Sequence, residues 1–235
     1  MASPPDPPDL DWLWPTPLLR RRLPNADALN ADLARTFVAF RDKQIAKRRA
    51  VPGPVYASPD DLLKRFHKKA LRDLFAFIGD AVFELAAAAN AAAWEGLEAT
   101  QLRVAIAGAW FQIQNGYGSH GVHSHGNCSW SGVYYVQCDA EEVRVAHPTL
   151  GARNGTLRFH GPRFERLGGA HQDVGNLYLQ DSVLDVAPEP GLLVLFPSWL
   201  PHEVLPYEGT EDRIAVSFNA LLEGSVRGAA GGFGF

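Results

Sequence analysis

The part of the chain after Gly96 alternates short β-forming runs with turn residues, and this alternation limits the possible folds more than any other feature. Each run is rich in Val, Ile, Leu or aromatic residues, and Gly, Pro, Asn or Asp separates it from the next. Short strands at such a spacing are typical of an antiparallel sandwich or barrel. We expect strands in QLRVAIAGAWFQIQ, WSGVYYVQ, EVRVA, TLRFHG, GLLVLFPSW and RIAVSFNALL.

The first hundred residues have a different pattern, because their apolar residues recur at the spacing of a helix. A first helix is expected to begin near Asn25 and to end before the Pro- and Gly-rich segment 51–57. A second is expected from the capping residue Ser58 to about Trp94, with Gly96 as its stop. The chain therefore predicts two long helices followed by a β-rich core.

The length of 235 residues, 46% of them hydrophobic, suits one sizeable core and is short for two. We therefore expect a single domain over residues 1–235. Within it, we expect an N-terminal extension with helices at 1–96, the β core at 97–223 and a Gly-rich flexible tail at 224–235.

Composition narrows the classes of partner and the location. The formal net charge of −4 gives no basic excess for nucleic acid or an anionic membrane. The longest apolar tract contains Glu84 and Asn90 and is too short to span a bilayer. Two cysteines are too few for a disulfide framework, and the first residues lack the pattern of a secretory signal. We expect a cytoplasmic protein that binds neither nucleic acid nor membranes.

Three histidines are the candidate metal ligands. His123 and His125 stand two residues apart before a β-forming run, so both side chains would point to one face of an extended strand. His202 follows the apolar run GLLVLF, at a strand end that can direct its imidazole inward. Three imidazoles suit zinc, iron, copper or nickel, and the spacing does not choose among them. A structural, hydrogen-bonded role for each histidine is the alternative.

A carboxylate-binding residue is predicted beside these histidines. A turn between His202 and Arg213 would place them on neighbouring antiparallel strands. Arg213 can bind a carboxylate through two hydrogen bonds, and Ser217 shares its face of the strand. A metal beside a buried Arg and Ser fits a chelating keto-acid co-substrate. The alternative is that Arg213 pairs with Glu211 or Asp212 at the surface.

Taken in order, these segments resemble a family of 2-oxoglutarate- and Fe(II)-dependent oxygenases. The most specific parts are HSH…SGVYYV and FPSWLPHEV…R…SFN. The opening segment LWPTPLLRRRLPNADALNADL and the segment LRFHGPR also match, although the family usually has an acidic residue at the position of Gly161. The resemblance implies a mainly β protein with N-terminal helices, in which a double-stranded β-helix (a cupin-like jelly roll) packs against two long α-helices.

The resemblance also implies an enzyme that uses Fe(II), 2-oxoglutarate and O₂. His123, His125 and His202 would bind the iron, and Arg213 would bind 2-oxoglutarate with Ser217 and Tyr135. The wider superfamily, which includes the prolyl hydroxylases, has a carboxylate at the position of His125. Either three imidazoles therefore bind the iron, or one of the HSH pair is not a ligand and a carboxylate or water replaces it.

The implied reaction hydroxylates an unactivated C–H bond of a small-molecule or amino-acid-like substrate while 2-oxoglutarate is decarboxylated to succinate. Two alternatives stay open: a cupin-like three-His metalloenzyme without 2-oxoglutarate, such as a thiol dioxygenase or an isomerase, and a non-catalytic metal-binding jelly roll. Desaturation or cyclisation, the substrate, and a homodimer through the helices also stay open. Candidate pocket residues, which could instead be core residues, are Trp110, Gln112, Tyr117, Trp130 and Trp199.

Overall fold

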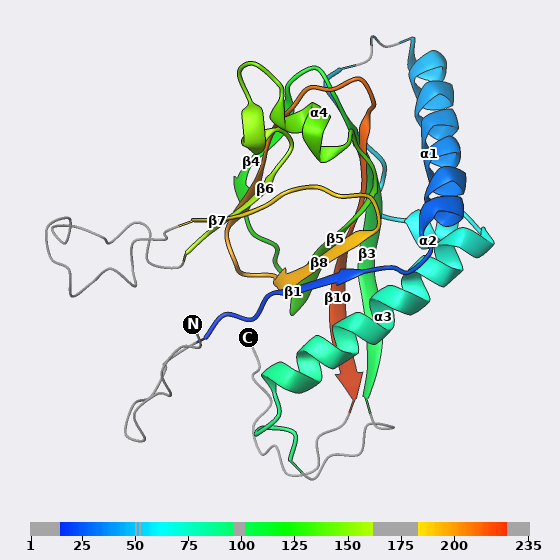
Figure 1. Ribbon diagram of the computed structural model, residues 1–235. Helices are drawn as coiled ribbons and strands as arrows, with labels where there is room; N and C mark the ends of the chain where they lie inside the picture. Colours follow the sequence, from blue (N-terminus) through cyan, green and yellow to red (C-terminus); the bar gives the residue numbers. More distant parts are fainter. Residues whose placement is uncertain (1–14, 50, 52, 96–101, 162–182, 225–235) are drawn as a thin grey trace, which may run out of the picture.

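Two antiparallel β-sheets face each other in the computed structural model, which describes residues 15–49, 51, 53–95, 102–161 and 183–224 (Figure 1). The six-stranded sheet contains, in spatial order, β1 (Leu19–Arg22), β8 (Leu192–Pro197), β5 (Trp130–Gln137), β10 (Arg213–Gly224), β3 (Leu102–Gln114) and β2 (Val55–Ala57). The four-stranded sheet contains β4 (Gly118–His123), β9 (His202–Tyr207), β6 (Leu157–His160) and β7 (Val183–Val186).

The connections between the sheets make the fold a double-stranded β-helix. From β3 to β10 the chain passes repeatedly from one sheet to the other, and among the described strands only β6 and β7 follow each other within one sheet. Because consecutive strands lie in opposite sheets, the loops at both ends of the two sheets connect one sheet to the other. The predicted fold class is confirmed, and β1 and β2 of the N-terminal region extend the larger sheet at its two edges.

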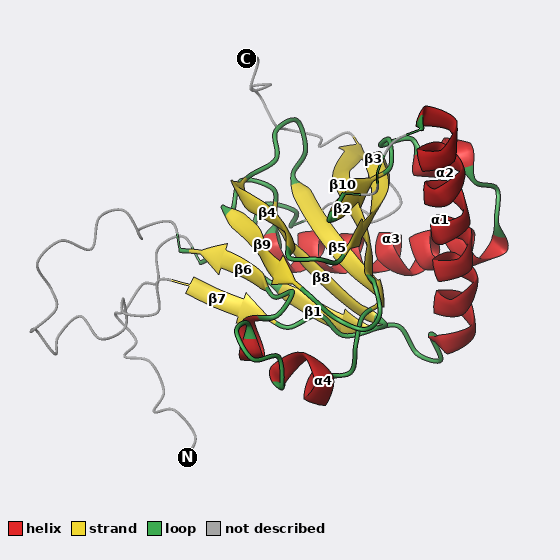
Figure 2. Ribbon diagram, turned by 90° about the horizontal axis from the view of Figure 1, so that it is seen from above, coloured by secondary structure: helices red, strands yellow, loops and turns green. Residues whose placement is uncertain are grey.

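The long helices α1 (Asp27–Arg48) and α3 (Lys69–Ala89) cover the outer face of the six-stranded sheet (Figure 2). Their buried side chains include Leu33, Phe37, Leu74 and Ile78. The Phe37 ring stacks on Phe111 of β3, with ring centroids 4.2 Å apart. No helix in the described ranges is long and apolar enough to cross a membrane.

The helix boundaries differ from the expected ones. Asn25 adopts a left-handed φ of 53°, and α1 begins two residues later. Ser58 is not a helix cap, because its hydroxyl accepts a hydrogen bond from the Phe111 backbone N–H (3.0 Å) and so attaches this segment to β3. The single expected second helix is divided into the short α2 (Leu62–Arg65) and α3, with Phe66 extended between them.

Strand prediction failed for EVRVA, which forms the helix α4 (Glu141–Val145). Its alternating valines suggested a half-buried strand, but Val143 and Val145 are 48% and 44% exposed while Arg144 is buried. The strands β4, β7 and β9 were not predicted. Two of them contain residues that disfavour strands, namely Gly121 in β4 and Pro206 in β9, so their pairing with neighbours decides their conformation. All of the predicted tail except Gly224 lies outside the described residues.

The larger sheet separates two cores. On β5, Tyr134 points to the outer core between sheet and helices, whereas Tyr135 points to the inner core between the two sheets. Gly132, on the outer face of β5, has no room for a side chain, because a Cβ there would lie 2.5 Å from the Phe218 ring and 2.6 Å from Leu195. Residues of β8 and β10 alternate in the same way.

Candidate metal and co-substrate site

Three imidazoles lie close together beside the end of β4 and the start of β9 in the smaller sheet. His123 ends β4, His202 begins β9, and the two face each other in the antiparallel register. The ring centroids of His123 and His202 are 4.4 Å apart. The ring centroid of His125 lies 5.1 Å from that of His123 and 5.2 Å from that of His202. One nitrogen from each ring lies within 4.8 Å of the others, so small rotations bring all three to one ion. The predicted histidines are therefore brought together.

The position of His125 has a different cause from the predicted one. It lies in the loop after β4, so strand alternation does not align it with His123. Instead, the His125 backbone N–H donates to the Ser198 carbonyl (2.9 Å), which fixes this loop to the β8–β9 turn. Asn127 then turns the chain with a positive φ of 57° toward β5.

Backbone carbonyls orient two of the rings. His123 Nδ1 donates to the Gly121 carbonyl (2.8 Å), and His202 Nδ1 donates to the Leu200 carbonyl (2.9 Å). A carbonyl can only accept, so the proton sits on Nδ1 and Nε2 keeps the lone pair that a metal needs. This is a common arrangement of metal-binding histidines.

Burial lowers the pKa of two of the three imidazoles. Burial lowers the pKa of His202 to about 4, an effect that the hydrogen bond to Leu200 only partly offsets. Burial, followed by the neighbouring His123, also lowers the pKa of His125. Because a metal competes with protons for these nitrogens, lowered pKa values favour metal binding near neutral pH.

Arg213 begins β10 and is only 1% exposed. Its Nε donates to the Gly155 carbonyl (3.2 Å), its Nη1 donates to Gln114 Oε1, and the guanidinium carbon lies 5.0 Å from the centre of the Tyr135 ring. Among the described residues, no carboxylate lies within 4.0 Å of it, and Asp212 instead accepts from Arg41 (2.7 Å). The surface ion pair considered as an alternative is therefore wrong.

Several buried polar atoms around Arg213 have no hydrogen-bond partner in the described part of the chain. They are Arg213 Nη2, Gln114 Nε2, Tyr135 Oη and His120 Nε2. Burial raises the pKa of Tyr135 even though Arg213 opposes this shift, so the phenol keeps its proton and can donate. An unpaired buried guanidinium costs free energy that a bound carboxylate would remove. The residues present therefore fit a ligand that carries a carboxylate.

A narrow cleft of about 40 Å³ connects the histidines with Arg213. Trp110, Gln112 and Ser217 line it as predicted, whereas Trp130 belongs to the outer core and Tyr117 and Trp199 are each 52% exposed. This volume holds little more than one water molecule, so side chains must move apart to admit a five-carbon diacid.

Gln114 is the site residue that sequence analysis did not single out. It faces Arg213 in the β3–β10 register and is completely buried. The only signal in the sequence is its position two residues after Gln112, which places both on the same face of β3. His120, which also lines the cleft, shares β4 with His123.

Comparison with known families identifies the class of protein to which this region is similar. Residues 108–219 match the family model described as "Putative 2OG-Fe(II) oxygenase". This region belongs to that family. The match includes the three histidines, Tyr135, Arg213 and Ser217, and it confirms the predicted class of Fe(II)- and 2-oxoglutarate-dependent oxygenase over the two alternatives without that chemistry. Enzymes of the family use Fe(II), 2-oxoglutarate and O₂.

Solved structures share the fold of this oxygenase at low sequence identity. A prolyl hydroxylase from Trichoplax adhaerens, in complex with a peptide fragment of hypoxia inducible factor, is 11% identical with a TM-score of 0.53 over 87% of this chain and 83% of its own. AviO1 from Streptomyces viridochromogenes is 14% identical with a TM-score of 0.52 over 87% and 89%. The epimerase SnoN, with Fe³⁺, α-ketoglutarate and nogalamycin RO, is 9% identical with a TM-score of 0.52 over 92% and 87%. No curated protein sequence matches the chain.

Proposed function

We propose that this oxygenase hydroxylates an unactivated C–H bond of a small-molecule or amino-acid-like substrate and converts 2-oxoglutarate to succinate. In this proposal His123, His125 and His202 bind Fe(II), and Arg213 binds the far carboxylate of 2-oxoglutarate. The observation that carries the proposal is the buried Arg213, without an acidic partner among the described residues, in the same narrow cleft as three clustered imidazoles.

Each residue has a definite task in this reaction. Bound Fe(II) supplies the redox chemistry that couples O₂ and 2-oxoglutarate to oxidation of a C–H bond. The carbonyls of Gly121 and Leu200 hold two imidazoles with Nε2 free. Arg213 Nη2 and the Tyr135 hydroxyl donate to the co-substrate carboxylate and so fix its orientation. Ser217 is placed to add a further hydrogen bond.

The proposed substrate class follows from the shared fold and from the lining of the cleft. The fold is shared with a prolyl hydroxylase that was solved with a peptide and with an epimerase that was solved with a small molecule. Trp110 lines the cleft with its ring centroid 6.0 Å from that of His125, where it can contact a substrate held beside the metal. A screen of free amino acids and small metabolites, with succinate as the readout and product mass as the identifier, would test this substrate class.

Replacement of His202 tests the metal site directly. His202→Ala is expected to abolish stoichiometric Fe(II) binding and the weak visible charge-transfer band of the anaerobic complex with 2-oxoglutarate. The fold should remain, because the inner core also contains many apolar residues. The matched control is His67→Ala, which changes an exposed histidine far from the cleft. Full iron content and activity in His202→Ala would show that His202 is not a metal ligand and that the iron binds elsewhere.

A further inference from the structure

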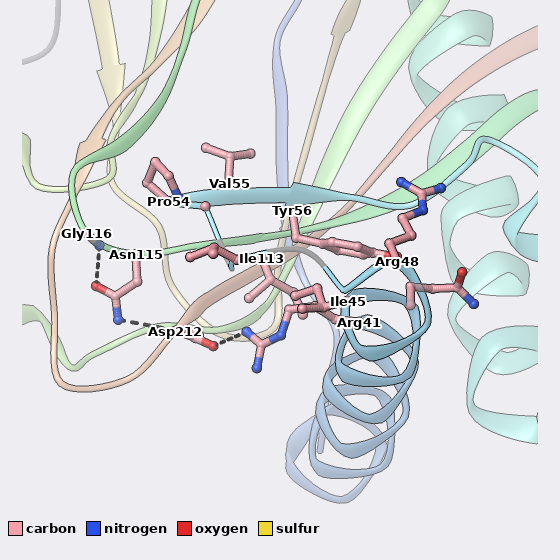
Figure 3. A pocket seen from close by; sticks show the side chains of 13 residues that line it. Arg41, Ile45, Arg48, Pro54, Val55, Tyr56, Ile113, Asn115, Gly116 and Asp212 are labelled. Atoms are coloured by element: carbon pink, nitrogen blue, oxygen red, sulfur yellow. Dashed lines mark hydrogen bonds and ion pairs between the residues drawn. The ribbon is translucent and has the colours of Figure 1, made fainter.

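A second and larger cavity, of about 570 Å³, lies beside α1 on the outer side of the six-stranded sheet (Figure 3). Its walls come from three parts of the chain: the C-terminal half of α1 together with β2 and the residues before it, the end of β3, and Asp212. This volume is in the range of small-molecule sites. None of the described residues lines both this cavity and the histidine cleft.

Strand alternation separates the two sites. Along β3, Gln112 lines the histidine cleft and Gln114 bonds to Arg213, whereas Ile113 lines the outer cavity. Asp212 lines the outer cavity, and its neighbour Arg213 points to the interior. The cavity therefore lies behind the predicted co-substrate site, with the sheet between them.

The wall before β2 is held by backbone contacts that resist collapse. The Pro54 carbonyl accepts a hydrogen bond from the Asn115 backbone N–H (3.0 Å). It also lies so close to Gly118 that a Cβ there would be 2.2 Å from the Pro54 oxygen. The Tyr56 ring packs against Phe111, with centroids 5.8 Å apart. The β2 side of the cavity is therefore fixed to β3.

The cavity combines apolar walls with positive charge. Ile45, Val55, Tyr56 and Ile113 supply apolar surface. Figure 3 shows Tyr56 extending toward Arg48, and the described residues include no acidic partner within 4.0 Å of the Arg48 guanidinium.

Arg41, at the other polar edge, already bonds to Asp212 (2.7 Å) and Asp42 (2.9 Å). Arg48 is therefore the lining cation that is available for a ligand. Lys43, Lys47 and Arg49 lie on the same end of α1 and add positive potential, in a chain whose net charge is −4.

We propose that this cavity binds a small organic anion, with an apolar or aromatic body against Ile45, Tyr56 and Ile113 and a single anionic group on Arg48. The ligand is distinct from 2-oxoglutarate, because it carries one anionic group on an apolar body rather than two carboxylates on a short chain. The site goes beyond the oxygenase activity and does not depend on it.

Calorimetric titration of the full-length protein with 1-naphthoate tests the proposal. We expect one saturable site whose affinity is unchanged by saturating 2-oxoglutarate. Arg48→Gln should weaken binding about tenfold, the loss expected for one hydrogen bond to a charged group. The matched control Lys47→Gln changes an exposed cation of the same helix that does not line the cavity, and it should leave the affinity unchanged. The neutral analogue 1-naphthalenemethanol should bind weakly and equally to both variants.

A second variant tests the location independently of charge. Ile45→Trp places an indole where the aromatic body of the ligand would lie and should abolish naphthoate binding, while succinate formation stays at the level of the unchanged protein. The proposal is overturned if naphthoate does not bind, if Arg48→Gln or Ile45→Trp binds it with unchanged affinity, or if 2-oxoglutarate displaces it. The assay needs no turnover, so failure of the proposed oxygenase reaction would leave its result interpretable.

Discussion

Tyr134 and Tyr135 are adjacent on β5 and both completely buried, but their hydroxyl groups have different surroundings. In the outer core, the Tyr134 hydroxyl donates to Asn30 Oδ1 of α1 (2.8 Å). In the inner core, the Tyr135 hydroxyl interacts with Arg213, but neither this hydroxyl nor Arg213 Nη2 has a hydrogen-bond partner of good geometry among the described residues. The buried phenol on the outer face of the sheet is thus hydrogen-bonded within the protein, whereas the buried phenol on the inner face is not.

This difference separates residues that stabilise the fold from residues that serve a ligand. Leaving a buried donor unpaired costs about 1–3 kcal/mol, so a group of such donors is unfavourable unless a ligand satisfies them. The outer core, with Phe37 stacked on Phe111, stabilises the sheet by apolar packing against the helices. The inner core can therefore include polar groups whose hydrogen bonds are made to a bound ligand rather than to each other.

The largest expected effect comes from His125, which tests whether the inner site is built for a metal. His125→Ala should lower Fe(II) affinity by more than the roughly 10–100-fold typical of groups that only orient a ligand. His125→Asp restores an oxygen ligand and should retain some iron and some 2-oxoglutarate turnover, although Asp is shorter than His. Iron content after desalting and succinate formation measure both variants.

The two variants also distinguish a ligand from an orienting residue. If His125 only orients a neighbour, alanine keeps the iron and aspartate is no better than alanine. Full iron occupancy in His125→Ala would rule out the three-histidine site, while His123 and His202 would remain candidates with an unidentified third group.

Replacement of Arg213 tests the same difference between the two cores through the binding of 2-oxoglutarate. Arg213→Ala should leave iron binding nearly intact but weaken 2-oxoglutarate binding by about 2–4 kcal/mol, because a charge-assisted contact in a buried site is lost. The control Arg158→Ala removes a guanidinium that is already paired with Asp185 (2.7 Å) near the surface. The measurement is the 2-oxoglutarate concentration that gives half-maximal succinate formation. An unchanged concentration in Arg213→Ala would show that Arg213 does not bind the co-substrate.

The main elements of this site were predictable because they depend on local pattern. Alternating apolar residues between turn residues predicted antiparallel strands, and the resemblance extended this to a jelly roll. The three histidines and Arg213 were predicted to come together, and they do so. By contrast, α4 was misassigned because its valines alternate on an exposed surface.

Features that depend on register or on loop contacts could not be predicted. Gln114 reaches Arg213 because these residues are paired between β3 and β10, and no local pattern specifies that register. His125 reaches the other imidazoles through a hydrogen bond from its loop to Ser198, so the correct grouping was inferred for a wrong reason. The outer cavity combines three segments that are far apart in the sequence, and none of them carries a recognisable motif.

The smallest effect gives the sharpest comparison, because Tyr134→Phe and Tyr135→Phe remove the same atom from neighbouring residues. Tyr134→Phe leaves Asn30 Oδ1 without its donor and should lower the free energy of unfolding by about 1 kcal/mol, with no change in 2-oxoglutarate affinity. Tyr135→Phe removes a hydroxyl that bonds to no described residue, so the ligand-free protein should be equally or slightly more stable. It should instead weaken 2-oxoglutarate binding by a similar amount, about 1 kcal/mol, because one donor to the carboxylate is lost. Chemical denaturation and 2-oxoglutarate titration of both variants measure the two effects. Loss of stability in Tyr135→Phe without loss of co-substrate affinity would show that the phenol is structural and that the inner core is not organised around a carboxylate at this position.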